Sequence, residues 1–106
     1  MSDDMSLRKK QSLFVKLIGE LISYAYSKGY ELTFGDAYAQ SGHKEKSNHY
    51  IRLAIDFNLF QDGIFLKQSE AHKPLGEYWE SLHPLCRWGG RFADGNHYSM
   101  EHKGLS

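Results

Sequence analysis

The chain has 106 residues, of which 41% are hydrophobic and 25% charged, and this composition is typical of one small folded domain rather than a disordered chain. Its 13 basic and 13 acidic residues cancel, which argues against a protein whose main work is binding nucleic acid through phosphates. The single cysteine, Cys86, excludes an internal disulfide, and we expect its side chain to be buried. We expect a single domain over residues 1–106, with loose polar tails at about 1–6 and 101–106.

The sequence also bears on the compartment. No apolar run approaches the roughly 20 residues of a membrane span, so we expect no stable membrane insertion. No apolar run follows a basic N-terminal region, as it would in a signal peptide. We therefore expect synthesis in a cytoplasm, with export depending on another factor.

The first half of the chain predicts a helix followed by a strand. Residues 7–28 carry apolar side chains at the three-and-four spacing of an amphipathic helix. Ser6 or Asp4 is expected to cap its start, and Gly29 stands where a C-terminal glycine is typical. Residues 30–38 alternate between apolar and polar side chains, which predicts a strand.

The second half predicts further strands around a short helix. After a surface loop over residues 39–48, apolar side chains alternate from Ile51 to Leu59 and predict a strand with one face on a core. A turn at 61–63 is expected to return the chain as a partner strand over 64–66. The remaining predicted elements are a polar connection at 67–72, a helix at 74–82, a glycine-kinked strand or turn at 88–92, and a short strand at 97–100.

Three residues in this pattern are candidates for one zinc site: His49, Asp56 and His97. Two histidines and one aspartate leave the fourth zinc position open, as catalytic zinc sites do. A fully extended chain from His49 to Asp56 would span ~23 Å, so the chain must bend around residues 50–52 to bring both to one metal. Asp94 precedes His97 by three residues, and the intervening Gly95 and Asn96 predict a tight turn. Asp94 would take the proton of the metal-bound water.

On spacing alone this zinc signal is weak, because the chain has six histidines and a single histidine is more often structural or at the surface. We expect the other histidines at the surface. We expect Glu80 to be a solvated helix carboxylate, with a supporting role behind the metal ligands left open. The residues expected at the surface are His43, His72, His83 and His102.

The stretch Ser47-x-His49-x-x-Arg52-x-Ala54-x-Asp56 resembles the S-x-H-x-x-G/R-x-A-x-D signature of the D-alanyl-D-alanine carboxypeptidase family of zinc peptidases. That family includes bacteriophage L-alanyl-D-glutamate endopeptidases that act as endolysins. The resemblance extends over about residues 30–100, and the combined string is more specific than any one piece. The further matching pieces are 52–60, 62–63, 75–82, 88–92 and 94–98.

The resemblance implies zinc ligands at His49, Asp56 and His97, with Asp94 as catalytic base. It implies an α+β fold, a small antiparallel sheet with helices packed against one side, as in hedgehog-type domains. It implies a peptidase that cuts the peptidoglycan stem peptide, either at L-Ala–D-Glu or at D-Ala–D-Ala. We expect the protein to be a monomer. The phage-like string favours a lysis enzyme that reaches the wall through a phage-encoded membrane pore.

One departure from the family pattern concerns the substrate. Family members usually carry an arginine after a Gly-Asp/Glu-Ala-Tyr stretch, but here Gly35 to Tyr38 is followed by Ala39. Losing such a contact commonly costs ~10²–10³ in rate, so a catalytically weakened relative that binds cell-wall peptides is the alternative. An unrelated small binding domain is a third reading. The candidate replacement cations are Arg52, Arg91 and Lys44.

The candidate substrate-binding residues are Arg52, Tyr50 and Tyr98. Arg52 would supply the missing cation. The two tyrosines flank predicted ligands, and each is as compatible with the core as with the substrate cleft.

Overall fold

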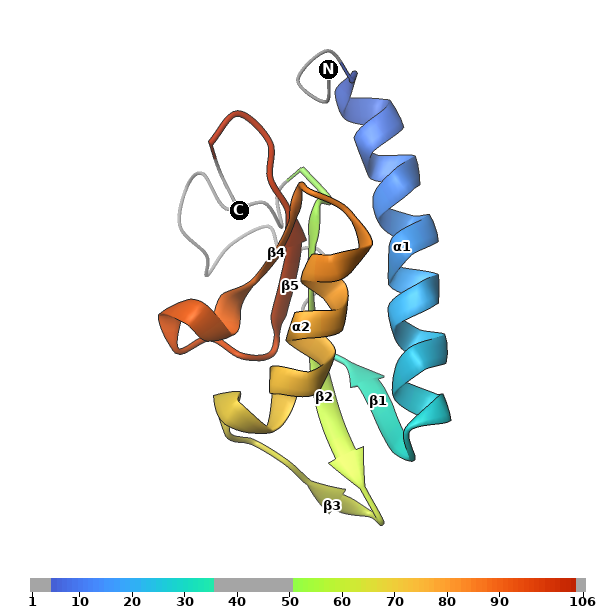
Figure 1. Ribbon diagram of the computed structural model, residues 1–106, viewed down its shortest axis with the longest axis vertical. Coiled ribbons are helices and arrows are strands. Elements are labelled where there is room, and N and C mark those ends of the chain that lie inside the picture. The colour runs from blue at the N-terminus through green and yellow to red at the C-terminus, as the bar shows by residue number, and fades with distance from the viewer. Residues whose placement is uncertain (1–4, 36–50, 105–106) are drawn as a thin grey trace.

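The computed structural model describes residues 5–35 and 51–104 of the chain (Figure 1). Within these ranges lie the helices and strands of an α+β fold, which confirms the predicted fold class. None of the described helices is both long enough and apolar enough to cross a membrane. The elements are α1 (Leu7–Ser27), β1 (Tyr30–Phe34), β2 (Ala54–Gln61), β3 (Ile64–Phe65), the 3-10 helix η2 (Ser69–His72), α2 (Lys73–Leu82), β4 (Cys86–Trp88), the 3-10 helix η3 (Gly89–Phe92) and β5 (His97–Met100).

Helix α1 begins and ends where the sequence predicts. The Ser6 hydroxyl accepts a hydrogen bond from the backbone N–H of Lys9 at 3.2 Å, which caps the start. Gly29 has a φ of +88° just after the helix, in the left-handed region that glycine adopts without steric cost. Between these ends the helix buries one apolar stripe in the core, formed by Phe14, Leu17, Ile18, Leu21 and Ala25.

The strands form a five-stranded antiparallel sheet in the order β1-β2-β5-β4, with β3 also paired to β2. Strand β1 pairs along one edge of β2 as far as Gln61, so β3 and β5 share the other edge. The β2–β3 hairpin turns at Asp62 and Gly63, which have positive φ values of 53° and 77°. Positive φ at both central residues is the requirement of a tight I′ turn, so the predicted turn is confirmed.

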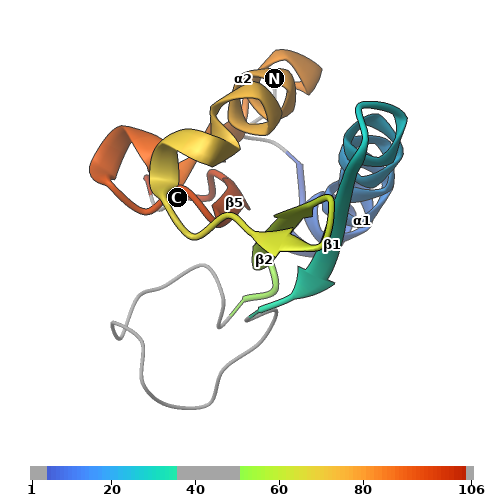
Figure 2. The same ribbon diagram turned by 90° about the horizontal axis from the view of Figure 1, so that it is seen from below.

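Both helices lie on the same side of the sheet (Figure 2). Ile55, Phe57 and Leu59 of β2 are buried, whereas Asp56 and Asn58 are only half-buried. Alternate side chains of a strand point to opposite faces, so Asp56 and Asn58 lie on the face away from the buried apolar residues. Trp79 of α2 closes the core, and its indole N–H donates to Ser99 C=O at 3.0 Å.

The structure corrects two boundaries of the predicted strands. The second strand begins at Ala54 rather than Ile51, because Ile51 and Arg52 form a turn in which Arg52 has a φ of +58°. We expected a bend around residues 50–52, and this turn confirms it for Ile51 and Arg52, the two of these residues that the structure describes. The first strand ends at Phe34, and residues 36–38 of the predicted strand lie outside the described ranges.

Two predictions about single side chains have opposite outcomes. Cys86 is buried as expected, and burial raises the pKa of its thiol to about 12, so it is protonated at neutral pH. The prediction that His72 lies at the surface is wrong, because only 3% of it is exposed. His72 is the last residue of the 3-10 helix η2. This helix lies within residues 67–72, for which the sequence predicts a polar connection.

Candidate metal centre

Asp56 and His97 meet across neighbouring strands. They are direct partners in the β2–β5 register, so their side chains leave the same face of the sheet. Asp56 Oδ1 lies 3.2 Å from His97 Nδ1, and the two side chains are 17% and 14% exposed. A carboxylate and an imidazole 41 positions apart in sequence are thus brought together by strand pairing.

The two atoms are within hydrogen-bond distance of each other, and the same separation suits two ligands of one zinc ion. Ligand atoms that each lie ~2.0–2.1 Å from a tetrahedral zinc are roughly 3.3 Å apart, close to the 3.2 Å found here. Among the described residues no group of three His, Cys, Asp or Glu side chains could hold a metal. The predicted third ligand, His49, lies outside those residues, so the described chain provides two of the three predicted donors.

Asp94 lies in a turn that leads directly into His97. The Asp94 C=O accepts the backbone N–H of His97 at 3.1 Å, which closes the turn through Gly95 and Asn96. The Asp94 side chain is exposed. This is the tight turn that the D-x-x-H spacing predicts, and it ties the candidate base to a candidate ligand.

Gly89 allows the Asp94 turn to pack closely against β5. Its C=O accepts the N–H of Asp94 at 2.9 Å. A Cβ added at Gly89 would lie 2.3 Å from the Asp94 carbonyl oxygen and 2.8 Å from His97 Cβ. No side chain fits in that space, so glycine at this position sets the distance between η3 and the candidate site.

Two further side chains hold the turn through Gly95. The Trp88 indole N–H donates to Gly95 C=O at 2.7 Å, and the Ser69 hydroxyl accepts Gly95 N–H at 2.9 Å. Sequence reasoning missed Ser69, which is 26 positions away from Gly95. No local sequence pattern predicts this contact, because it depends on how η2 packs beside η3.

Glu80 is a structural carboxylate rather than a solvated one. It accepts hydrogen bonds from the backbone N–H of Trp88 at 3.0 Å and from Arg91 Nε at 2.9 Å. Burial raises its pKa, but the hydrogen bonds from Arg91 and Trp88 outweigh that effect and lower the pKa overall. Arg91, a predicted replacement cation, is therefore bound to Glu80 on the side of η3.

The three predicted substrate-binding residues have different placements. Arg52 is exposed in the turn before β2, and Tyr50 lies outside the described residues. Tyr98 is completely buried, and its hydroxyl lies 2.7 Å from Nδ1 of His72. Burial raises the Tyr98 pKa, so the phenol is neutral, and its position in the core does not support direct contact with a substrate.

A hollow of about 230 Å³ opens beside the Asp94 turn. It is bounded by β2, by the chain that follows β3, by η2 and by the turn itself. Its lining residues are Phe57, Asn58, Phe65, Leu66, Lys67, Ser69, His72, Ala93, Asp94, Gly95 and Asn96. The candidate base thus lines one hollow together with β2 and the chain that follows β3.

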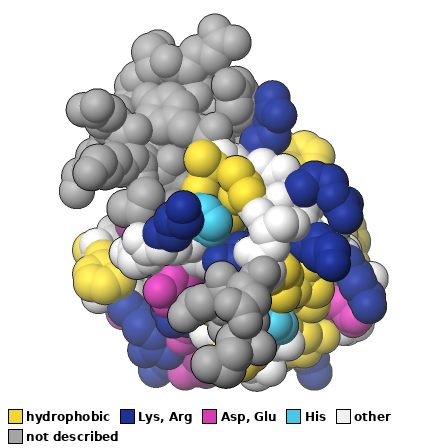
Figure 3. Space-filling view, turned by 90° about the horizontal axis from the view of Figure 1, so that it is seen from above, with side chains coloured by type: hydrophobic (Ala, Val, Ile, Leu, Met, Phe, Trp, Pro, Cys, Tyr) yellow, Lys and Arg dark blue, Asp and Glu magenta, His cyan; other side chains and the backbone are white. Residues whose placement is uncertain are grey.

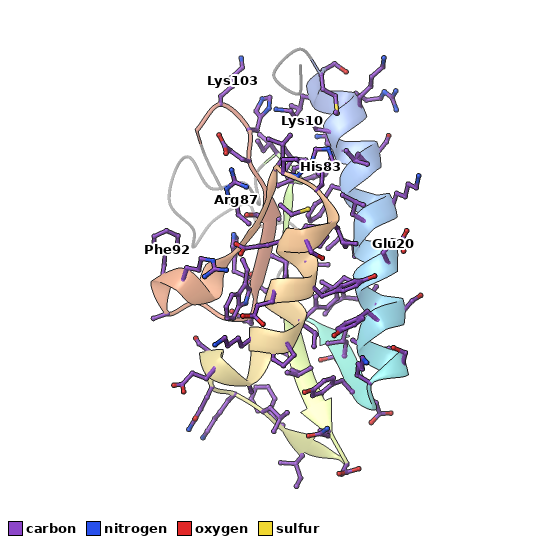
Figure 4. All side chains as sticks on the ribbon, in the orientation of Figure 1. Lys10, Glu20, His83, Arg87, Phe92 and Lys103 are labelled. Carbon is purple, nitrogen blue, oxygen red and sulfur yellow. The ribbon has the colours of Figure 1, made fainter. Side chains whose placement is uncertain are left out.

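A second hollow of about 540 Å³ lies beyond the other end of β5. Lys10, His102 and Lys103 line it, and Lys10 Nζ lies 3.0 Å from His102 Nδ1. Figure 4 shows Lys10 and Lys103 at the end of the molecule where α1 begins, and Figure 3 shows Lys and Arg side chains gathered there. Glu101 also lines this hollow, but its carboxylate pairs with Arg87, and the described residues hold no group of three metal-binding side chains.

Comparison with known families matches residues 41–100 to the D-alanyl-D-alanine carboxypeptidase family. The matched segment includes His49, Asp56, Asp94 and His97. No curated protein matches the chain.

Proposed function

The chain belongs to the D-alanyl-D-alanine carboxypeptidase family, and we propose that it is a zinc-dependent hydrolase of the peptidoglycan stem peptide. Membership supports a peptidase that acts on peptidoglycan in general. The bond proposed for cleavage is L-Ala–D-Glu or D-Ala–D-Ala. The observation that carries the proposal is the Asp56–His97 pair at 3.2 Å, joined to Asp94 by one turn.

Asp56 and His97 would hold the zinc ion together with His49. The donor set of one carboxylate and imidazole nitrogens is one that zinc prefers and that leaves a position for water or substrate. When bound, zinc polarises the scissile carbonyl and lowers the pKa of its water toward ~7.

Asp94 would handle the protons of the reaction. Its side chain is exposed, and its backbone is joined to His97 by one turn. It would accept the proton of the attacking water and pass it to the amine that leaves when the peptide bond breaks. The Gly89 and Gly95 contacts hold the turn in place, which lowers the cost of orienting that carboxylate.

A second candidate is a weakened relative that binds cell-wall peptides. The observation in its favour is Ala39, which stands where the family usually carries a substrate-binding arginine. Arg91 is paired with Glu80. Arg52 and Lys44 are the other sequence-based replacements. Retention of Asp94 favours the active enzyme over this alternative.

The biological setting forms part of the same proposal. We propose a monomeric phage lysis enzyme that is made in the cytoplasm and reaches the wall through a phage-encoded membrane pore. Its partner would be the stem peptide rather than nucleic acid, since the net charge is zero.

Digestion of purified peptidoglycan with the zinc-loaded protein tests the proposed activity. Mass spectrometry of the products is expected to show one new amino terminus, either D-Glu or D-Ala, at the cleaved bond. Protein treated with a chelator is the control and should release neither. Binding of stem peptide without any new terminus would favour the weakened relative, and neither binding nor cleavage would refute both candidates.

A further inference from the structure

We propose that Lys67 binds a carboxylate of the substrate peptide in the hollow beside Asp94. This inference rests on the proposed peptidase function and adds a specificity-determining residue to it. Lys67 follows β3, 27 positions before Asp94 in sequence, and both residues line the same hollow. It lies outside the motifs that identify the family in this sequence.

The hollow sits at a break in the sheet. Strands β3 and β5 pair with different parts of the same edge of β2. The last hydrogen bond toward β5 runs from Phe57 N–H to Asn96 C=O at 3.0 Å. The first hydrogen bond toward the β3 hairpin runs from Leu66 N–H to Leu59 C=O at 2.8 Å. Between these two bonds the edge of β2 faces the hollow. A strand edge of this kind accepts an extended peptide through main-chain hydrogen bonds.

The charges that line the hollow favour a carboxylate near Lys67. Lys67 is exposed, and none of the salt bridges between described residues involves it. The other basic residue of the lining, His72, is neutral at pH 7 because burial lowers its pKa to about 4. Lys67 is thus the one positive charge among the described lining residues, and Asp94 is the one carboxylate among them.

These two charges give a peptide substrate a direction. The scissile bond must reach Asp94, whereas a substrate carboxylate is repelled by Asp94 and attracted to Lys67. A stem peptide carries carboxylates on side chains and at its C-terminus, and either source presents the same chemistry to an ammonium group. Lys67 would therefore select peptides with a free carboxylate a short distance from the cleaved bond.

The test uses the zinc-loaded protein and soluble stem peptides in three forms. One has all carboxylates free, one has its side-chain carboxylates amidated, and one has an amidated C-terminus. The variants are Lys67→Ala, Lys67→Arg and, as a charge-matched control, Lys16→Ala on the exposed face of α1. The kinetic readout is KM against kcat for each pair of protein and peptide.

Lys67→Ala is expected to raise KM about tenfold for the free peptide, with kcat within about twofold, because a charged hydrogen bond is lost in binding. Lys67→Arg should restore most of the affinity. For the wild type, amidating the carboxylate that Lys67 binds should raise KM by the same factor as Lys67→Ala does on the free peptide. On that amidated peptide, Lys67→Ala should cause no further rise in KM. The form of peptide that removes the effect of Lys67 identifies which carboxylate is bound.

Equal KM values for Lys67→Ala and Lys16→Ala would overturn the assignment of Lys67, and so would a Lys67 effect that both amidated peptides retain. If the wild type cleaves no peptide, the proposed function fails, and calorimetric Kd values for the same series test Lys67 separately. Similar Kd values for Lys67→Ala and Lys16→Ala would then also overturn it.

Discussion

At the scale of single residues, the buried His72–Tyr98 pair has a direct effect on stability. The hydroxyl of Tyr98 lies 2.7 Å from His72 Nδ1, and burial lowers the His72 pKa from 6.5 to about 4. Between these two values the unfolded chain binds a proton that the folded chain does not. Stability therefore falls as pH falls through this window and is fully present above about pH 6.5.

We predict that the wild type loses about 3 kcal/mol of its free energy of unfolding from this one histidine between pH 7 and pH 4. His72→Gln keeps a polar side chain near Tyr98 but does not titrate, so its stability should depend less on pH. Urea unfolding at several pH values measures both proteins, and His83→Gln controls for the loss of a histidine. Parallel pH curves for wild type and His72→Gln would contradict the predicted role of burial.

At the scale of elements, η3 and the Asp94 turn act as one packed unit. Gly89 brings their backbones together, Glu80 anchors η3 through Arg91, and Trp88 covers Gly95. Phe92, which is 83% exposed, projects from η3 away from α2 (Figure 4). The unit is thus fixed on its inner side, where it meets His97.

We predict that Gly89→Ala destabilises the protein by roughly 1–3 kcal/mol, because the new methyl group overlaps backbone and Cβ atoms that cannot move cheaply. Hydrolysis should fall further than stability alone explains, since the overlap involves both Asp94 and His97. The control is Gly19→Ala in α1, where a Cβ meets nothing within 4 Å. That change should stabilise the helix by about 0.5–1 kcal/mol, as measured by thermal unfolding, and leave hydrolysis unchanged.

A Gly89→Ala protein with normal stability and normal hydrolysis would show that the turn tolerates displacement. The packing of η3 against the Asp94 turn would then not be needed for hydrolysis.

The elements differ in how far the sequence reveals them. Local chemistry is sufficient for the Ser6 cap, the Asp62-Gly63 turn and the alternation of β2, because each depends on neighbouring residues. The Asp94–His97 turn was predicted for the same reason. The roles of Ser69, His72 and Glu80 depend on packing between distant segments, which no spacing rule encodes.

At the scale of the whole molecule, a bound zinc ion would tie two strands of the sheet. Asp56 belongs to β2 and His97 to β5, and the two strands also support the buried core through Ile55 and Tyr98. A ligand that binds only the folded state stabilises it by mass action, by about 4 kcal/mol when its free concentration is 1,000 times Kd. Zinc should therefore stabilise the fold as well as the site.

We predict that removal of zinc by a chelator lowers Tm by about 10 °C or more, since 1 kcal/mol shifts Tm by roughly 4–8 °C in a domain of this size. His97→Ala, which removes one proposed ligand, is the control and should respond little to the chelator. Calorimetric scans of both proteins with and without chelator provide the comparison. Identical wild-type scans would indicate that no zinc is bound to the folded state.

The most direct test of a zinc peptidase with Asp94 as its base measures zinc content and peptidoglycan hydrolysis on the same samples. Asp94→Asn keeps the size of the side chain and removes its proton acceptor. It should retain the zinc of the wild type and lose about 100-fold or more of the release of free amino groups. His97→Ala should lose zinc and hydrolysis together. An Asp94→Asn protein that digests peptidoglycan at the wild-type rate, or a His97→Ala protein with undiminished zinc, would contradict the account.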